Sequence, residues 1–147
     1  MTTAADHLSQ NLVSSLQGEK IVTLITMDDQ MLPQLSAVSW VIANQEGTKI
    51  KIALGHKASS IQNIQINPNV VLGVIGAGSY YAIKGTASVS DVVELTMKLQ
   101  VVTVDIESVE DVIFYGGKII TEPAYEKTYN PELAKKLDTE VYALLRQ

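Results

Sequence analysis

The residues with the clearest chemical potential lie in the stretch 54–68, LGHKASSIQNIQINP. This stretch leaves a predicted strand, passes through small residues and enters a predicted helix that ends at an asparagine–proline pair. Ser59 and Ser60 stand at the start of that helix, where backbone N–H groups and the helix dipole favour a phosphate. His56 and Lys57 precede them and would add positive charge to an anion held there. The stretch predicts an anion site; the alternative is a capped helix beside an exposed His and Lys.

Other motifs that could suggest chemistry have structural interpretations. The sequence GAGS at residues 76–79 contains a Gly-x-Gly, but strand-forming residues follow it, so it predicts a hairpin rather than a dinucleotide site. The acidic residues at 28–29 and 105–111 match no calcium loop, and we expect a solvated turn and a charged strand end. The chain has no cysteine and two histidines, and it contains no Gly-x-Ser-x-Gly elbow. We therefore expect neither a metal site nor a catalytic nucleophile.

Trp40, the single tryptophan, lies in a second predicted strand. Core packing is the simplest interpretation of a large indole in a strand. The alternative is that Trp40 forms a wall of a cofactor pocket, because tryptophan combines a flat apolar surface with one hydrogen-bond donor. The aromatic residues at 80, 81, 114 and 115 leave the same two interpretations open.

Length and composition define the class of protein. A chain of 147 residues fits a single domain, residues 1–147, that can bury a core without disulfides. The net charge of −5, without a basic stripe, argues against a nucleic-acid partner. No apolar run reaches the length of a membrane helix, and the first residues lack the basic and apolar regions of a signal peptide. We expect a cytoplasmic protein with no membrane partner.

The periodicity of apolar residues predicts mostly strands, with a helix at each end and one in the middle. The middle helix follows the third predicted strand and ends at residue 67. The predicted strands are residues 21–27, 35–42, 48–54, 70–75, 80–87 and 98–106, and the terminal helices are residues 6–17 and a segment that begins after Asn130. Several short strands with regularly spaced turns favour a barrel or sandwich over a parallel sheet.

Four segments carry a family resemblance: PQLSAVSW at 33–40, IKIAL at 50–54, NIQINPNV at 63–70 and YAIKGTA at 81–87. On these, the chain resembles the pyridoxamine 5′-phosphate oxidase-like FMN-binding split-barrel family, especially its short bacterial, general-stress-protein-like members. The resemblance implies a mainly β fold with flanking helices, a six-stranded Greek-key split β-barrel. It also implies a homodimer with FMN in two clefts at the subunit interface.

The same resemblance implies where FMN would bind. Its ring would lie along one strand and its phosphate at the start of the middle helix. The expected cofactor-binding residues are Val38, Ser39, Trp40, Leu54, His56, Lys57, Ser59 and Ser60. The apolar character of both faces of residues 38–42 and 70–75 exceeds what one small barrel interior needs, which predicts that these strands form the homodimer interface.

The chain departs from the family pattern at two places. Many members have Ser-Arg-Lys before the helix where this chain has residues 58–60, ASS, and the second strand carries no Arg or Lys. A hydrogen bond to a charged group contributes about 1.5–3 kcal/mol, so losing two would weaken phosphate binding by roughly 3–6 kcal/mol. Three interpretations follow: an FMN-dependent oxidoreductase of unknown substrate, a split-barrel binding module that has lost FMN and holds another phosphorylated or planar ligand or none, or a structural dimer.

Overall fold

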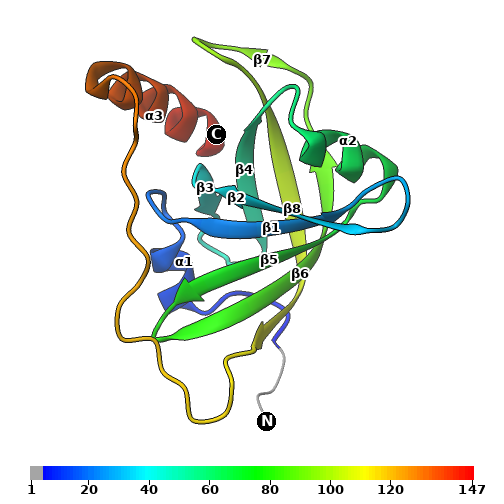
Figure 1. Ribbon diagram of the computed structural model, residues 1–147, viewed down its shortest axis with the longest axis vertical. Coiled ribbons are helices and arrows are strands. Elements are labelled where there is room, and N and C mark those ends of the chain that lie inside the picture. Colours follow the sequence, from blue (N-terminus) through cyan, green and yellow to red (C-terminus); the bar gives the residue numbers. More distant parts are fainter. Residues whose placement is uncertain (1–4) are drawn as a thin grey trace.

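A computed structural model of the chain describes residues 5–147 and shows a mainly antiparallel β half-barrel flanked by helices (Figure 1). The elements in chain order are α1 (Gln10–Ser15), β1 (Val22–Met27), β2 (Pro33–Val38), β3 (Val41–Ala43), β4 (Lys49–Gly55), α2 (Ser59–Ile66), β5 (Asn69–Gly76), β6 (Ser79–Val89), β7 (Val93–Glu94), β8 (Lys98–Asp111) and α3 (Pro131–Leu145). The described strands form one sheet in the order β2-β1-β5-β6-β8-β4-β3, with β7 paired to β8. This architecture confirms the predicted mainly β split barrel.

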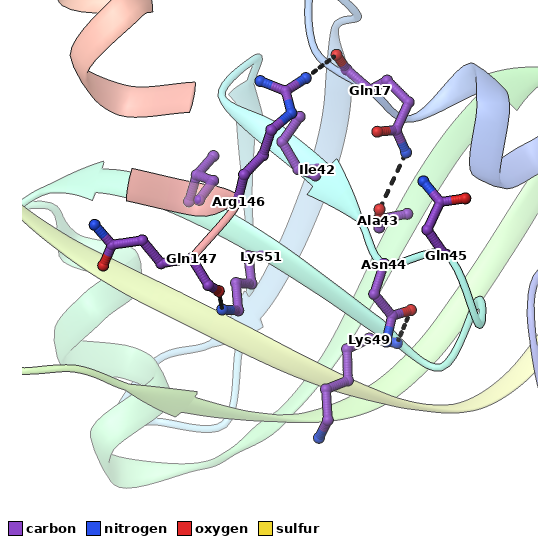
Figure 2. A pocket seen from close by; sticks show the side chains of 10 residues that line it. Gln17, Ile42, Ala43, Asn44, Gln45, Lys49, Lys51, Arg146 and Gln147 are labelled. Atoms are coloured by element: carbon purple, nitrogen blue, oxygen red, sulfur yellow. Dashed lines mark hydrogen bonds between the residues drawn. The ribbon is translucent and has the colours of Figure 1, made fainter. Parts of the chain in front are cut away.

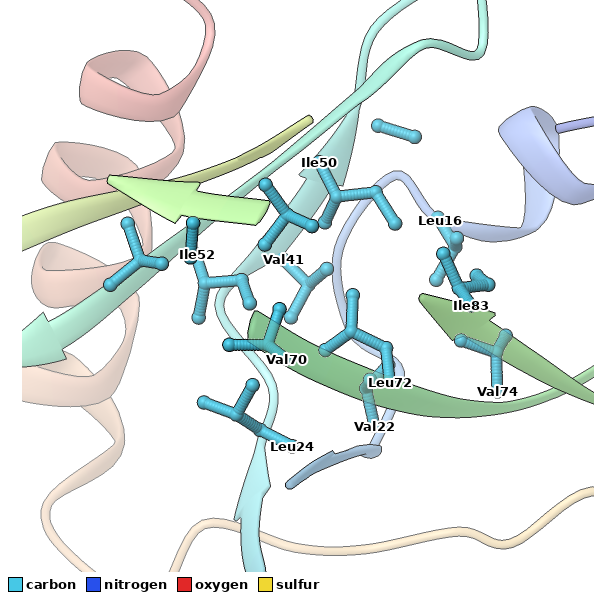
Figure 3. Packing of buried hydrophobic residues seen from close by; sticks show 14 of the residues in the cluster. Leu16, Val22, Leu24, Val41, Ile50, Ile52, Val70, Leu72, Val74 and Ile83 are labelled. Carbon is cyan, nitrogen blue, oxygen red and sulfur yellow. The ribbon is translucent and has the colours of Figure 1, made fainter. Parts of the chain in front are cut away.

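Alternate residues of the strands fill the inside of the barrel. Leu24 of β1, Ile52 of β4 and Leu72 of β5 are fully buried, and Figure 3 shows their side chains meeting those of neighbouring strands. Complete burial of such a side chain contributes about 1.5–3 kcal/mol. Because a shift of one residue would turn these side chains to the outside, the apolar interior fixes the strand register.

The predicted second strand, residues 35–42, is two strands in the structure. β2 ends at Val38 and pairs with β1, whereas β3 begins at Val41 and pairs with β4. The prediction of one continuous strand was wrong because β-forming residues continue through the point at which the pairing partner changes. Since β2 and β3 stand at opposite ends of the sheet order, the two residues between them connect both ends of the sheet.

β8 extends to Asp111, beyond the predicted end at residue 106. The acidic residues expected at a strand end therefore lie within β8, which pairs with β6 from Val102 to Asp111. The register of this pair shifts between Lys84 and Gly85. A Cβ on Gly85 would stand 2.4 Å from the carbonyl oxygen of Asp105, so this bulge requires glycine.

The predicted hairpin is confirmed as β5 and β6. Ala77 and Gly78 form its turn with φ angles of 50° and 76°. Two consecutive residues with positive φ match the type I′ turn, which favours glycine at the second position. The GAGS sequence thus forms the turn of a hairpin, in agreement with the prediction from the strand-forming residues that follow it.

The terminal helices differ in how well the sequence predicted them. α1 is shorter than the predicted 6–17, because the backbone N–H of Leu8 donates to Gly47 O at 2.8 Å and holds the preceding residues outside the helix. α3 begins where predicted, with Asn130 Oδ1 accepting from the backbone N–H groups of Glu132 and Leu133. Within residues 5–147, no helix is both long and apolar enough to cross a bilayer.

α3 lies against β3 and β4 and secures the junction between β2 and β3 (Figure 1). Trp40 Nε1 donates to Asp138 Oδ1 at 2.8 Å, and Lys127 Nζ donates to the same oxygen at 2.5 Å. Lys127 Nζ also lies 5.6 Å from the centre of the Trp40 ring. Burial acts to raise the pKa of Asp138, but the hydrogen bonds from Lys127 and Trp40 outweigh it and hold the pKa below its ordinary value of 3.8.

We expect Asp138→Asn to reduce the free energy of unfolding by about 1–2 kcal/mol at neutral pH, because a hydrogen bond to a charged group contributes more than a neutral one. Urea unfolding followed by Trp40 fluorescence measures this difference. The stabilisation is complete above the unfolded-state pKa of Asp138 and is lost as the pH falls through the lower folded-state pKa. The gap between wild type and variant should therefore close below pH 3.8; a gap that stays constant in acid would contradict the assignment.

Candidate functional site

Neutral hydrogen bonds hold the start of α2 against β2. Gln34 Nε2 donates to Ser59 Oγ at 2.7 Å, and the hydroxyl oxygens of Ser36 and Ser60 lie 3.0 Å apart. The side chain of Ser60 is buried, with 3% exposure, whereas Ser59 is exposed. The structure therefore brings both predicted serines to β2 but leaves only Ser59 accessible to a ligand.

Asn63 extends these contacts into the barrel. Its Nδ2 donates to Thr26 Oγ1 at 3.0 Å and to Gln34 Oε1. Asn63 and Thr26 are both buried, and no buried side-chain nitrogen or oxygen among the described residues lacks a hydrogen-bond partner. The sequence analysis missed Gln34, Ser36 and Asn63. The alternation of polar residues 34 and 36 with apolar neighbours was the available signal, because alternate strand residues share one face.

Lys57 and Ser59 form the accessible part of this site, because Ser60 and Ile61 are buried and the Ile61 N–H donates to Ala58 O at 3.1 Å. The first N–H groups of a helix have no partner within the helix, and Ala58 at the N-cap offers no side-chain oxygen to accept from them. Ser59 Oγ accepts from Gln34, so its own O–H can donate to a ligand. Lys57 is exposed. Together these groups offer donors and one positive charge, which suit a small anion such as a phosphate.

Three further predicted residues make packing or strand-end contacts. The backbone N–H of His56 donates to Lys98 O at 3.1 Å, and its Nδ1 lies 3.3 Å from the same oxygen. Val38 and Leu54 are half-buried and pack against the barrel core. A contact between any of these residues and a cofactor stays a prediction.

Ser39 and Trp40 lie at the junction between β2 and β3, and their contacts are with the C-terminal part of the chain. The Trp40 indole packs in a second apolar cluster with Val141 and Leu145 of α3. The carbonyl oxygen of Ser39 lies 3.5 Å from Tyr142 Oη, and burial raises the pKa of Tyr142 to about 12. The structure thus places Trp40 against α3 and Ser59 against β2.

A cavity of about 440 Å³ beside the end of α3 carries the basic residues Lys49, Lys51 and Arg146 (Figure 2). Lys51 Nζ donates to the backbone oxygen of Gln147 at 2.9 Å, Arg146 Nη2 donates to Gln17 O at 3.4 Å, and Lys49 forms an ion pair. Figure 2 shows the charged ends of Lys49 and Arg146 pointing away from each other. Because these cations are engaged and diverge, we place the candidate site at α2. Among residues 5–147, no cluster of His, Asp and Glu could hold a metal ion.

The outer surface of β2, β1 and β5 carries a short apolar row, which ends at Lys84 of β6. The strand register places Leu35 beside Ile25 and Ile25 beside Val71. In the next row Ala37 lies beside Thr23. We call this surface the outer sheet face and define it by Ile25, Leu35, Ala37 and Val71. Leu35 is 68% exposed and the neighbouring residues of β1 and β5 are half-buried. Contiguous exposed apolar surface of this kind marks interaction sites.

Comparison with known proteins informs the fold. No protein-family model matches the sequence, and no curated protein does. A candidate pyridoxamine 5′-phosphate oxidase from Lactobacillus delbrueckii is similar in structure, with a TM-score of 0.60 and 17% identity over 74% of this chain and 97% of that protein. General Stress Protein 26 from Bacillus anthracis has a TM-score of 0.54 and 14% identity over 66% of this chain and 88% of its own.

A third similar structure is HutZ, a heme storage protein from Vibrio cholerae, with a TM-score of 0.50 and 18% identity over 62% of this chain and 84% of its own. At these identities the likeness is one of fold. The sequence periodicity, the sheet order and these three structures agree on the same architecture. The chain has the split-barrel fold of the pyridoxamine 5′-phosphate oxidase-like proteins.

Proposed function

We propose that this protein is an FMN-binding split-barrel homodimer that holds the FMN phosphate at the start of α2. The observation that carries the proposal is the exposed Ser59, whose hydroxyl accepts from Gln34 and keeps its own O–H for a ligand. Lys57 and the first amides of α2 stand next to it. The shared fold with a candidate pyridoxamine 5′-phosphate oxidase supports a flavin as the ligand.

The hydrogen-bond donors at α2 fit a phosphate. They carry less positive charge than a site in which β2 also contributed Arg and Lys. β2 contributes Gln34 and Ser36 at the positions that face α2, and both are neutral. A hydroxyl or amide donor contributes about 0.5–1.5 kcal/mol, whereas a charged partner contributes about 1.5–3 kcal/mol. FMN should therefore bind reversibly and exchange with free flavin in solution.

The flavin ring would lie along Val38, Ser39 and Trp40, with backbone amides near its polar edge. When bound, FMN would supply hydride or electron transfer, and the chain would supply binding and orientation. Asp138 accepts from the Trp40 indole N–H and the Trp40 carbonyl oxygen accepts from Ala53 N–H, so Trp40 would meet the ring through apolar contact and its own backbone N–H. No side chain of the chain is assigned a catalytic role.

The outer sheet face is the proposed dimer interface. Leu35, Ile25 and Val71 form a continuous apolar row across three strands, and a second copy of the chain would remove this row from water. Burial of apolar surface contributes roughly 25 cal/mol per Å².

A second candidate function is a split-barrel binding protein that does not use a flavin. The neutral contacts of Ser59 with Gln34 and of Ser60 with Ser36 favour it, because they occupy part of the hydrogen-bonding capacity of both serines. The similar fold of a heme storage protein provides one example of a different ligand. Anaerobic addition of NADH or NADPH to protein mixed with FMN separates the candidates: bleaching of protein-bound flavin supports an oxidoreductase, whereas no flavin uptake supports the second candidate.

We expect Lys57→Ala to weaken FMN binding by about 1.5–3 kcal/mol, because it removes the charge nearest the proposed phosphate position. Ser59→Ala should weaken binding by about 0.5–1.5 kcal/mol, the contribution of a neutral hydrogen bond. Ser60→Ala should leave affinity unchanged and lower stability, since that hydroxyl is buried against Ser36. Titration of flavin fluorescence measures the affinities and urea unfolding the stabilities.

Lys135→Ala is the matched control for these titrations, because Lys135 is an exposed lysine on α3, distant in the chain from α2. Its affinity for FMN should equal that of the wild type. If Lys57→Ala and Ser59→Ala also bind FMN as the wild type does, the phosphate lies elsewhere. If Ser60→Ala alone weakens FMN binding, the assignment of ligand binding to Ser59 and of a structural role to Ser60 is wrong.

We expect Leu35→Glu to convert the dimer to a monomer, because it places a charge in the apolar row of the outer sheet face. Light scattering at micromolar concentration should give a mass of about twice 16.0 kDa for the wild type and 16.0 kDa for the variant. Val92→Glu, an exposed apolar residue near β7, is the control and should remain dimeric. A wild-type mass of 16.0 kDa would refute the dimer.

A further inference from the structure

We propose that a cleft between α3 and the segment that joins β7 to β8 binds an uncharged, flat and largely apolar small molecule. We call this site the α3 cleft; it has a volume of about 530 Å³ and is lined by Trp40, Thr96, Met97, Tyr129, Leu133 and Leu137. Small-molecule sites are typically concave, about 300–1,000 Å³ in volume, and lined by apolar and aromatic side chains. The proposal concerns a second site and does not rest on FMN binding, although Trp40 is close to both.

Both walls of the α3 cleft are held in place by carboxylates of α3. Glu140 Oε1 accepts from the backbone N–H of Thr96 at 2.9 Å, and Glu140 Oε2 accepts from the Thr96 hydroxyl at 2.7 Å. On the other side, Asp138 accepts from Trp40 Nε1. These bonds fix the segment between β7 and β8 and the indole relative to the same helix. The cleft is therefore preformed, which lowers the entropic cost of binding a ligand.

The charged groups beside the α3 cleft are already engaged in an ion pair or in hydrogen bonds, which favours an uncharged ligand. Asp138 accepts hydrogen bonds from Lys127 and Trp40. Both carboxylate oxygens of Glu140 accept hydrogen bonds from Thr96. The hydrogen bonds from Thr96 hold the pKa of Glu140 below its ordinary value, so this carboxylate stays ionised and bonded at neutral pH. An anionic ligand would find no unpaired cation among these groups, and a cationic ligand would compete with Thr96 for the Glu140 carboxylate.

The lining chemistry favours a flat ligand. Trp40 and Tyr129 offer ring surfaces, which stack on planar groups with a preferred geometry. Met97 and Leu133 are exposed by 39% and 41%, and Tyr129 by 41%. A ligand that covered these three side chains would remove apolar surface from water at three sides of the cleft. Met97 adds a flexible side chain that can adapt to the shape of the ligand.

The single tryptophan makes the α3 cleft directly observable. We expect the uncharged aromatic probe N-phenyl-1-naphthylamine, titrated into the full chain without FMN, to increase in fluorescence as Trp40 emission decreases. Leu133→Glu should weaken this binding by about tenfold or more, because it places a charge against the bound probe. Met97→Glu, on the opposite wall of the cleft, should weaken probe binding in the same way. It replaces Leu133→Glu in the test if that variant does not fold. Circular dichroism checks folding of each variant.

Ile120→Glu is the control for probe binding to exposed apolar side chains, because Ile120 is 90% exposed and lies outside both the α3 cleft and the outer sheet face. It should bind the probe as the wild type does. FMN titration of Leu133→Glu separates the two proposals, because affinity for FMN should be unchanged. Loss of probe binding in Ile120→Glu, or its retention in folded Leu133→Glu and Met97→Glu, would overturn the α3 cleft. A fall in mass on Leu133→Glu without a change in probe affinity would also overturn it, since the cleft would then be covered by a second copy.

Discussion

Two residues, Ser39 and Trp40, connect the opposite ends of one β-sheet, and the rest of the structure depends on this connection. β2 and β3 are neighbours in sequence but occupy the first and last places in the sheet order. A flat sheet could not place them so close, so the sheet curves until its ends approach each other. The apolar side chains of the inner face then fill the interior. Asp138 of α3 bonds to the indole of Trp40 and so stabilises the junction from outside.

The closed interior determines where a ligand can bind. Since packed side chains fill the barrel (Figure 3), the available sites lie at its ends and on its outer surfaces. α2 lies beside β1 and β6, and its neutral bonds to β2 leave Ser59 and Lys57 at the surface. The segment between β8 and α3, residues 112–130, runs along the outside of the barrel (Figure 1). Its Lys127 lies over the ring of Trp40. The same topology thus separates an anion site at α2 from an apolar cleft at α3.

Much of the fold could be predicted from local patterns, and the differences have physical reasons. The hairpin of β5 and β6 and the cap of α3 depend on nearby residues, Gly78 and Asn130, so the sequence predicts them well. The break after Val38 depends on a change of pairing partner, and partners distant in sequence leave no local signal. For the site, Ser59 and Ser60 were predicted as an equivalent pair. Their separation into one exposed and one buried hydroxyl depends on Gln34 and Ser36 of β2, which only the tertiary structure brings to them.

We propose that the start of α2 receives a phosphate through Ser59 and Lys57. The most direct measurement is a crystal structure of the full chain grown with FMN. We expect the flavin phosphate within hydrogen-bond distance of Ser59 Oγ and Lys57 Nζ, with Ser60 still hydrogen-bonded to Ser36. A flavin phosphate bound away from α2, or a chain that crystallises without flavin at saturating FMN, would contradict it.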